Sequence, residues 1–337
     1  MAEVVQVVQD FKQALLLRDA RQMQEMAAHW MRIERNLQDK IEALAAQLSM
    51  MKDDGQLVKQ WRLNELDRYR ELLAQLRVEM SSYLDDAERQ ISATQSDYGE
   101  LGILNAQDAL KAAIRDARIM DMRFNNLPVD AAENMAGLLG NGSPLRTLLD
   151  EAFGDSVDGM TQALMDGTAL GWNPRKTARA ALGAPGLSSG GMARGLGRIM
   201  TIARTEQLRV YREASRMQYQ ASGVVDGYKR ISAKDDRVCM ACLIADGTFY
   251  PLSVPLADHP NGRCALIPCV KGVGRPEWQT GQAWFLEQSE DQQRQTMGAA
   301  KYAAWRAGKF DLTSLVQATD DPVWGPSIGV TPLRGLV

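Results

Sequence analysis

The sequence lacks an apolar run long enough to cross a membrane. Its longest apolar runs are far shorter than the roughly 20 residues that a membrane-spanning helix needs. The first residues, Met1-Ala2-Glu3, also lack the basic stretch that precedes the apolar core of a secretory signal. We therefore expect neither a membrane segment nor an export signal in these 337 residues.

Cysteine and histidine are scarce, and their positions restrict the chemistry. The four cysteines lie between residues 239 and 269, whereas a disulfide-stapled secreted domain spreads its cysteines through a short chain. They are Cys239, Cys242, Cys264 and Cys269. The two histidines are His29 and His259, so a Ser-His-Asp or Cys-His hydrolase would have to use one of them. We expect one local cysteine site, and a hydrolytic triad is unsupported.

Several enzyme motifs are missing. The glycine-rich segment 184–191 contains no Gly-Lys-Ser/Thr, so it predicts a flexible connector and not a phosphate-binding loop. A zinc deaminase needs His-x-Glu before its cysteine pair, but here His259 follows the pair and Asn261 stands two residues later. A nuclease of the HNH type needs a further His or Asn downstream, and none follows Asn261. A metal-dependent nuclease or hydrolase is therefore a weak alternative, and we expect no enzymatic activity.

Charge is unevenly distributed along a chain whose formal net charge is only -3. Residues 175–237 contain thirteen Lys and Arg against five Asp and Glu, a local formal charge of +8. Such a segment could contact DNA phosphates, or it could be a solvated helix face. The candidate DNA-contacting residues are Arg175, Lys176, Arg179, Arg194 and Arg198.

The N-terminal third has the spacing of long helices. Apolar residues recur in steps of three and four from Met23 to Met51, and again from Trp61 to Ile91, which is close to a heptad repeat. Asp53-Asp54-Gly55 interrupts the pattern. We expect a long helical hairpin or coiled coil that pairs within or between chains, with a plain helical bundle as the alternative.

The whole chain predicts a mainly α protein with a small α+β domain. A helix is expected from 192 to 221, strands over 224–231 and 248–256, and further helices near 281–307. The expected segments are the helical hairpin 1–98, a helical domain 99–191 ending in the glycine-rich connector, an α+β domain 192–275 with the cysteines, and a helical tail with an extended arm at 276–337.

The cysteine cluster has the spacing of a zinc site. Cys239 and Cys242 form a Cys-x-x-Cys knuckle, and His259 and Cys264 follow it after a loop. Four such donors suit the tetrahedral preference of a structural Zn²⁺. Cys269 is left over or replaces His259, and the alternatives are reduced thiols or a disulfide.

The same region resembles a known family. Ala203-Arg204-Thr205-Glu206, then Asp235-Asp236-Arg237-Val238-Cys239 with Cys242, then Asp246-Gly247, and then His259-Pro260-Asn261-Gly262-Arg263-Cys264 resemble the signature of the Mu F-like phage head morphogenesis family. The chain has Val238 where that pattern has Thr, and Gly262 where it has a first Cys. The close resemblance covers about residues 190 to 270. The N-terminal part shares with that family only its helical character.

The resemblance implies a structural minor head protein of a tailed phage. Such a protein would associate with the portal or the capsid protein, in the head interior or at the portal vertex of the virion, after assembly in the host cytoplasm. It would act in head assembly or genome delivery, and a DNA-binding or ejected internal protein is the alternative. The basic segment 175–237 adds packaged DNA as a candidate partner. The resemblance also implies structural roles for Arg204, Glu206, Asp235 and Arg263.

Overall fold

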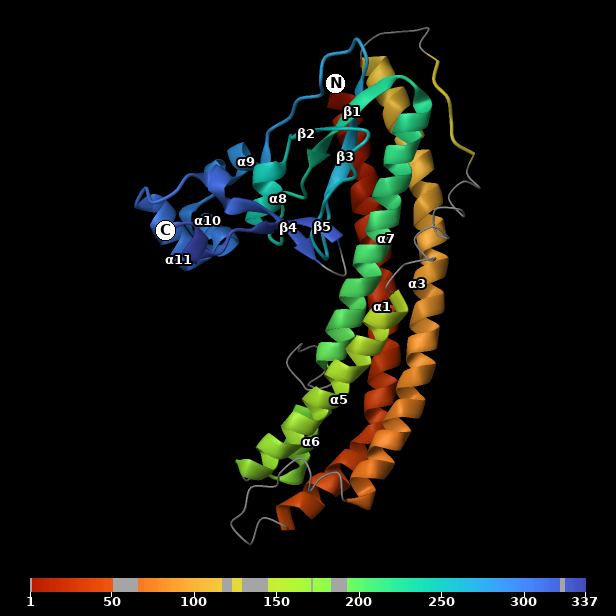
Figure 1. The fold of residues 1–337 in the computed structure, drawn as a ribbon, viewed down its shortest axis with the longest axis vertical. Helices are drawn as coiled ribbons and strands as arrows, with labels where there is room; N and C mark the ends of the chain where they lie inside the picture. The colour runs from red at the N-terminus through yellow and green to blue at the C-terminus, as the bar shows by residue number, and fades with distance from the viewer. Residues whose placement is uncertain are drawn as a thin grey trace. The chain divides into compact units, whose positions relative to one another are not determined.

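The computed structural model describes residues 2–50, 66–116, 123–128, 145–170, 172–182, 193–321 and 325–337. The chain divides into two compact units. The first unit comprises Met1–Leu17, Thr94–Asn141 and Thr205–Val337, and the second comprises Arg18–Ala93 and Gly142–Arg204. The described residues are mainly helical, with a small antiparallel sheet and the cysteine cluster in the first unit (Figure 1).

Two long helices account for the N-terminal heptad pattern. They are α1, Ala2–Met50, and α3, Asp67–Asp116. The predicted apolar stripe of α1 is buried, because positions three and four apart fall on one helix face. On α3, Leu72 is buried in place of the predicted Leu73, which is half-buried. The helix continues through residue 98 without a break, and Asp53-Asp54-Gly55 lies outside the described residues.

Three further helices lead to the sheet. α5 spans Leu145–Ala169, α6 spans Pro174–Leu182 and α7 spans Ala193–Ser222. α7 agrees with the helix predicted for 192–221, and it stops before Gly223, whose φ of +73° is a left-handed conformation that glycine adopts without strain. Within the first unit, Ser215 of α7 donates a 3.1 Å hydrogen bond to the carbonyl of Gly102 of α3, so these helices pack closely there.

The sheet has three antiparallel strands in the order β2-β1-β3. β1, Val225–Ile231, agrees with the strand predicted over 224–231. β2, Phe249–Pro251, covers only the first part of the strand predicted over 248–256, and β3, Ala265–Val270, is an addition. β3 is buried along its whole length, and it packs with Tyr219 and Tyr228 into the main apolar cluster of the first unit. The sheet therefore joins the end of α7 to the segments that carry the cysteines.

The C-terminal segment packs on a short helix, α8, Met240–Ala245. α9, Gly281–Glu287, α10, Glu290–Met297, and α11, Ala299–Arg306, agree with the helices predicted near 281–307, and Figure 1 shows them gathered beside α8. They share one apolar cluster with Cys242 and Cys264, formed with Leu243, Phe285, Met297, Tyr302 and Leu315. The cysteine knuckle and the tail therefore have a common core.

The C-terminal segment for which we predicted an extended arm contains paired strands. β4, Val316–Asp321, and β5, Gly325–Val330, pair as an antiparallel two-stranded ladder. Backbone pairing satisfies donors and acceptors that a free arm would leave to water. No described helix is long and apolar enough to cross a membrane.

Candidate metal centre

The cysteine knuckle is built by the N-terminus of α8. Cys239 is the residue before the helix, and its sulfur accepts a 3.4 Å hydrogen bond from the backbone N–H of Cys242. The extended conformation of Cys239, φ -92° and ψ 156°, is the one that an N-cap residue adopts. Both sulfurs are therefore directed to one side of a tight turn.

His259 completes a three-residue group. Its Nε2 lies 3.2 Å from the sulfur of Cys239 and 3.2 Å from the sulfur of Cys242. A second group shares Cys242 and adds Asp258 and Cys264. Within each group the donor atoms lie within 4.8 Å of one another, so the cluster could hold a metal ion.

The loop that carries His259 is held in place by α7. The hydroxyl of Thr205 accepts a 3.0 Å hydrogen bond from the backbone N–H of Asn261, which has a left-handed φ of +62°. Gly262 packs directly against Asp258, because a Cβ at 262 would lie 2.2 Å from the carboxylate carbon. The glycine that departs from the family pattern thus gives the Asp258 side chain its space.

Two arginines and Asp258 form a buried charge network behind the sulfurs. Arg230 Nη2 lies 2.6 Å from Asp258 Oδ1 and 3.5 Å from the Cys242 sulfur, and Nη1 donates to the carbonyl of Ala257. Arg212 Nη1 lies 3.3 Å from Asp258 Oδ2 and donates a 3.0 Å hydrogen bond to the carbonyl of Gly262. The side chains of Arg230 and Asp258 are 0% and 1% exposed, so this ion pair is shielded from water.

The protonation of the cluster follows from these contacts. The hydrogen bond with Cys242 raises the pKa of His259 to about 9, although burial acts in the opposite direction. The hydrogen bond with Cys242 also lowers the pKa of the Cys239 thiol. For Cys264, the hydrogen bond with Cys242 and complete burial raise the pKa well above its ordinary value. A bound cation would displace these protons, because metals bind thiolates and neutral imidazoles.

Cys269 does not belong to the cluster. It lies on β3 opposite Gly227 of β1, and burial raises the pKa of its thiol to about 11. Cys269 lies within β3, whereas Cys264 comes directly before the strand. The predicted group of Cys239, Cys242, His259 and Cys264 is brought together, with Asp258 beside it.

The residues implied by the family resemblance are internally bonded. Arg263 forms a two-pronged ion pair with Asp235, in which Nη2 lies 2.7 Å from Oδ1. Arg204 lies 2.6 Å from Asp19 within the second unit. Glu206 is buried, and burial raises its pKa. These contacts fit structural roles.

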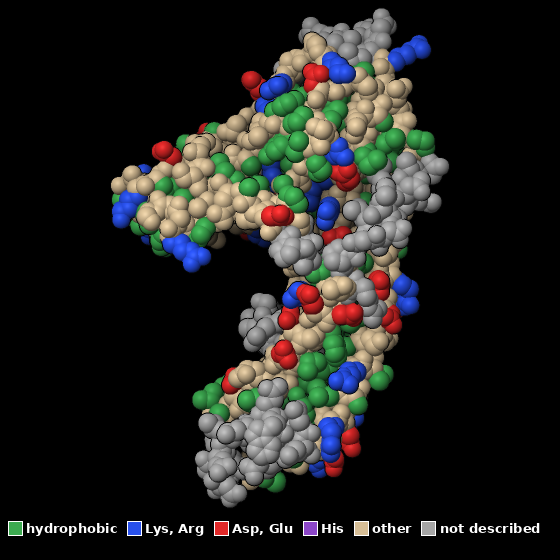
Figure 2. All heavy atoms as spheres, in the orientation of Figure 1, with side chains coloured by type: hydrophobic (Ala, Val, Ile, Leu, Met, Phe, Trp, Pro, Cys, Tyr) green, Lys and Arg blue, Asp and Glu red, His purple; other side chains and the backbone are tan. Residues whose placement is uncertain are grey.

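The predicted DNA-contacting residues differ in their surroundings. Arg175, Lys176 and Arg179 are exposed on one face of α6, and Lys176 lies 4.2 Å from the ring centre of Trp172. Arg198 is instead paired with Glu151 and Asp155 of α5, and the side chain of Arg194 lies outside the described part. On the face drawn in Figure 2, the described charged side chains of both signs are interspersed.

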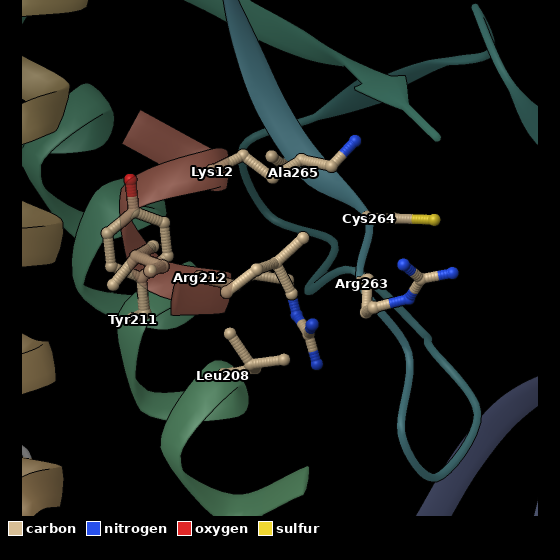
Figure 3. A pocket seen from close by; sticks show the side chains of 9 residues that line it. Lys12, Leu208, Tyr211, Arg212, Arg263, Cys264 and Ala265 are labelled. Atoms are coloured by element: carbon tan, nitrogen blue, oxygen red, sulfur yellow. The ribbon is translucent and has the colours of Figure 1, made fainter. Parts of the chain in front are cut away.

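A small cavity adjoins Cys264 in the first unit (Figure 3). Lys12, Arg212 and Arg263 line it together with apolar residues, and its volume is about 10 Å³. Burial lowers the pKa of Lys12 to about 8, while Cys264 raises it. A space of this size holds about one water molecule, so it does not accommodate an organic substrate.

Sequence reasoning did not include two residues that hold the site in place, Arg230 and Asp258, among the site residues. Asp258 precedes His259, and adjacent carboxylates often position a metal-binding imidazole, which is a usable signal. Arg230 carries no sequence signal, because only the pairing of β1 in the sheet brings it beside Cys242. Comparison with known protein families, curated proteins and solved structures finds no match for the chain.

Proposed function

We propose that this chain is a structural minor head protein of a tailed phage that resembles the Mu F-like family. It associates with the portal or the inner capsid and acts in head assembly or genome delivery, with the Cys/His cluster as a zinc staple. The observation that carries the proposal is that the separate motifs of the resemblance meet at one site. Thr205 contacts Asn261, Asp235 pairs with Arg263, and His259 lies on Cys239 and Cys242.

The donor chemistry of the cluster supports a structural metal over a catalytic one. Cys239, Cys242 and Cys264 offer soft sulfur donors, and His259 offers a nitrogen, which is the usual composition of a closed zinc site. A closed set leaves no coordination position for water or substrate. The small volume of the adjacent cavity agrees with this interpretation.

The long helices support a docking role. In the first unit Val4 of α1 donates to Asp116 of α3, and Tyr98 donates to the carbonyl of Leu15. In the second unit Tyr83 donates to the carbonyl of Met26, and Asn36 donates to Glu79. Within each unit, higher numbers on α1 pair with lower numbers on α3. We infer an antiparallel helical hairpin or coiled coil that presents its polar faces to a capsid or portal oligomer.

The second candidate is contact with packaged DNA. The exposed cations Arg175, Lys176 and Arg179 occupy one face of α6, and the buried residues Thr177, Ala178 and Leu182 occupy the other. Such a face can neutralise phosphates and release their counterions, so its affinity would fall steeply with salt. Replacing the three cations by Gln should reduce DNA retention if this contact exists.

Cryo-electron microscopy of intact particles tests the leading proposal. We expect density for the chain bound to the portal or the inner capsid wall in wild-type particles, and its loss in particles made without the chain. Co-sedimentation of purified chain with empty heads provides a second measurement. Absence of the chain from both particles and heads would overturn the structural assignment.

A further inference from the structure

The cluster contains five potential ligands, and a tetrahedral zinc site takes four of them. Asp258 and Cys264 compete for the fourth position, because each lies in a three-residue group with Cys242. We propose that Cys264 is the fourth ligand and that Asp258 belongs to a buried charge-balancing network with Arg230 and Arg212. This inference rests on the proposed metal site and its four predicted ligands, and adds the roles of Asp258 and the two arginines.

The contacts of the carboxylate favour an outer role for Asp258. Its Oδ1 accepts hydrogen bonds from Arg230 Nη2 at 2.6 Å and from the backbone N–H of His259 at 3.1 Å. Its Oδ2 has no hydrogen bond among the described residues but lies 3.3 Å from Arg212 Nη1. Each oxygen of the carboxylate thus faces a guanidinium group, and the hydrogen bond with the backbone N–H of His259 fixes the loop that carries the imidazole.

The contacts of Cys264 are compatible with metal binding, because Arg230 hydrogen-bonds with its sulfur and a metal-bound thiolate still accepts such a hydrogen bond. It is buried in the apolar cluster that also contains Cys242, Leu243 and Phe285, and its thiol shares a hydrogen bond with Cys242. A thiolate left in such surroundings without a cation would be costly. A metal ion bound to both sulfurs removes that cost, so the position suits a ligand.

Formal charge distinguishes the two ligand sets. Three thiolates and a neutral imidazole around Zn²⁺ leave one net negative charge, and Asp258 adds a second. Arg230 and Arg212, with side chains 0% and 7% exposed, carry two positive charges to offset them. With Asp258 in place of Cys264 as a ligand, one buried arginine charge would remain without an offset, which a buried site tolerates poorly.

Arg230 is therefore a positioning residue of the metal centre. It connects β1 to both the knuckle and the histidine loop through the Cys242 sulfur, Asp258 and the carbonyl of Ala257. Loss of such an outer contact typically lowers metal affinity about 10- to 100-fold.

Cobalt substitution of the full chain tests the ligand assignment. The intensity of thiolate-to-cobalt charge transfer rises with the number of thiolate ligands, and the visible bands report tetrahedral geometry. We expect three thiolates in the wild-type chain, two in Cys264→Ser, and three in Asp258→Asn. Two thiolates in the wild type with no change in Cys264→Ser, or loss of tetrahedral bands in Asp258→Asn, would overturn the proposal.

Zinc competition with a colorimetric chelator tests the arginine. We expect Arg230→Lys, which keeps the charge but loses the forked geometry, to bind zinc about 10-fold more weakly. Arg209→Lys, an exposed position on α7, should match the wild type. Wild-type affinity in Arg230→Lys would overturn the positioning role. Head association is measured by cryo-electron microscopy and co-sedimentation, which do not depend on the metal. A negative result in the zinc and cobalt experiments would therefore not overturn the proposed head function.

Discussion

The backbone N–H of Gly281 donates a 2.7 Å hydrogen bond to Asp246 Oδ2. A Cβ at position 281 would lie 2.5 Å from the carbonyl oxygen of Leu243, so α9 begins in direct contact with α8. Asp246 also accepts from the backbone N–H of Ser232 at 2.5 Å and from Trp278 Nε1 at 3.0 Å. One carboxylate therefore links β1, α8 and the C-terminal helices.

Removal of this carboxylate should destabilise the first unit. Asp246→Ala leaves the buried N–H groups of Ser232 and Gly281 and the half-buried Trp278 Nε1 without their acceptor, and we expect a loss of about 3 kcal/mol in the free energy of unfolding. Urea unfolding followed by tryptophan fluorescence measures it. Asp226→Ala is the matched control, since Asp226 is exposed. Equal midpoints for the two variants would show that Asp246 does not anchor the tail.

Glycine 262 should not tolerate a side chain. Gly262→Ala would place a Cβ 2.2 Å from the Asp258 carboxylate, and we expect a loss of about 1–3 kcal/mol from the forced displacement. Gly154→Ala in α5 is the control, because a Cβ at position 154 would meet no described atom within 4 Å. That control should gain about 0.5–1 kcal/mol through helix propensity.

Opposite signs for these two substitutions, measured by urea unfolding followed by circular dichroism, would support the packing of Gly262 on Asp258. A neutral Gly262→Ala would mean that the loop has room to move away from the carboxylate.

The second unit should show a pH dependence from Glu34. Burial raises the pKa of Glu34 to about 7, although its hydrogen bond with Trp30 acts the other way. Since the folded pKa lies above the ordinary value of 4.5, the stability that Glu34 contributes is complete below about pH 4.5 and is lost as pH rises through about 7.

We therefore expect Glu34→Gln to raise Tm relative to the wild type at pH 8 and to have little effect at pH 4.5. Glu25→Gln, at an exposed position on the same helix, should show no such difference. Differential scanning calorimetry across this range measures both variants. A constant difference between Glu34→Gln and the wild type at all pH values would contradict the raised pKa.

Metal removal should loosen the C-terminal helices. Cys242 and Cys264 share an apolar cluster with Phe285 and Tyr302, so loss of a metal from the sulfurs should disturb the packing of α9 and α11. We expect chelation to increase amide hydrogen exchange in these helices and to leave α5 unchanged. If amide exchange in α9 and α11 is the same before and after chelation, in a chain shown to have lost zinc, then the packing of these helices does not depend on the metal.

The local spacing of the cysteines determined much of the site. The Cys-x-x-Cys knuckle is a local feature, since Cys239 and Cys242 are three residues apart on one turn. Helix periodicity likewise predicted the buried face of α1 from Met23 to Leu48. These predictions succeed because neighbours in sequence fix the geometry.

Other features depended on the tertiary fold. The sequence did not predict β3, because its six residues are all buried and therefore show no alternation of apolar and polar residues. Pro268 also argues against a central strand, but β3 lies at the edge of the sheet, where a proline is tolerated. The β ladder near the C-terminus depends on the pairing of β4 with β5, and the sequence analysis did not predict this pairing.

The sequence by itself determined that four cysteines and one histidine fall within a short segment, and that long amphipathic helices precede them. Only the tertiary structure decided that His259, and not Cys269, lies with Cys239 and Cys242, and that Arg230, Arg212 and Asp258 lie beside the sulfurs. The physical reason is that strand alternation and helix packing bring together charges that lie far apart in sequence. Their burial then makes each charge require a partner.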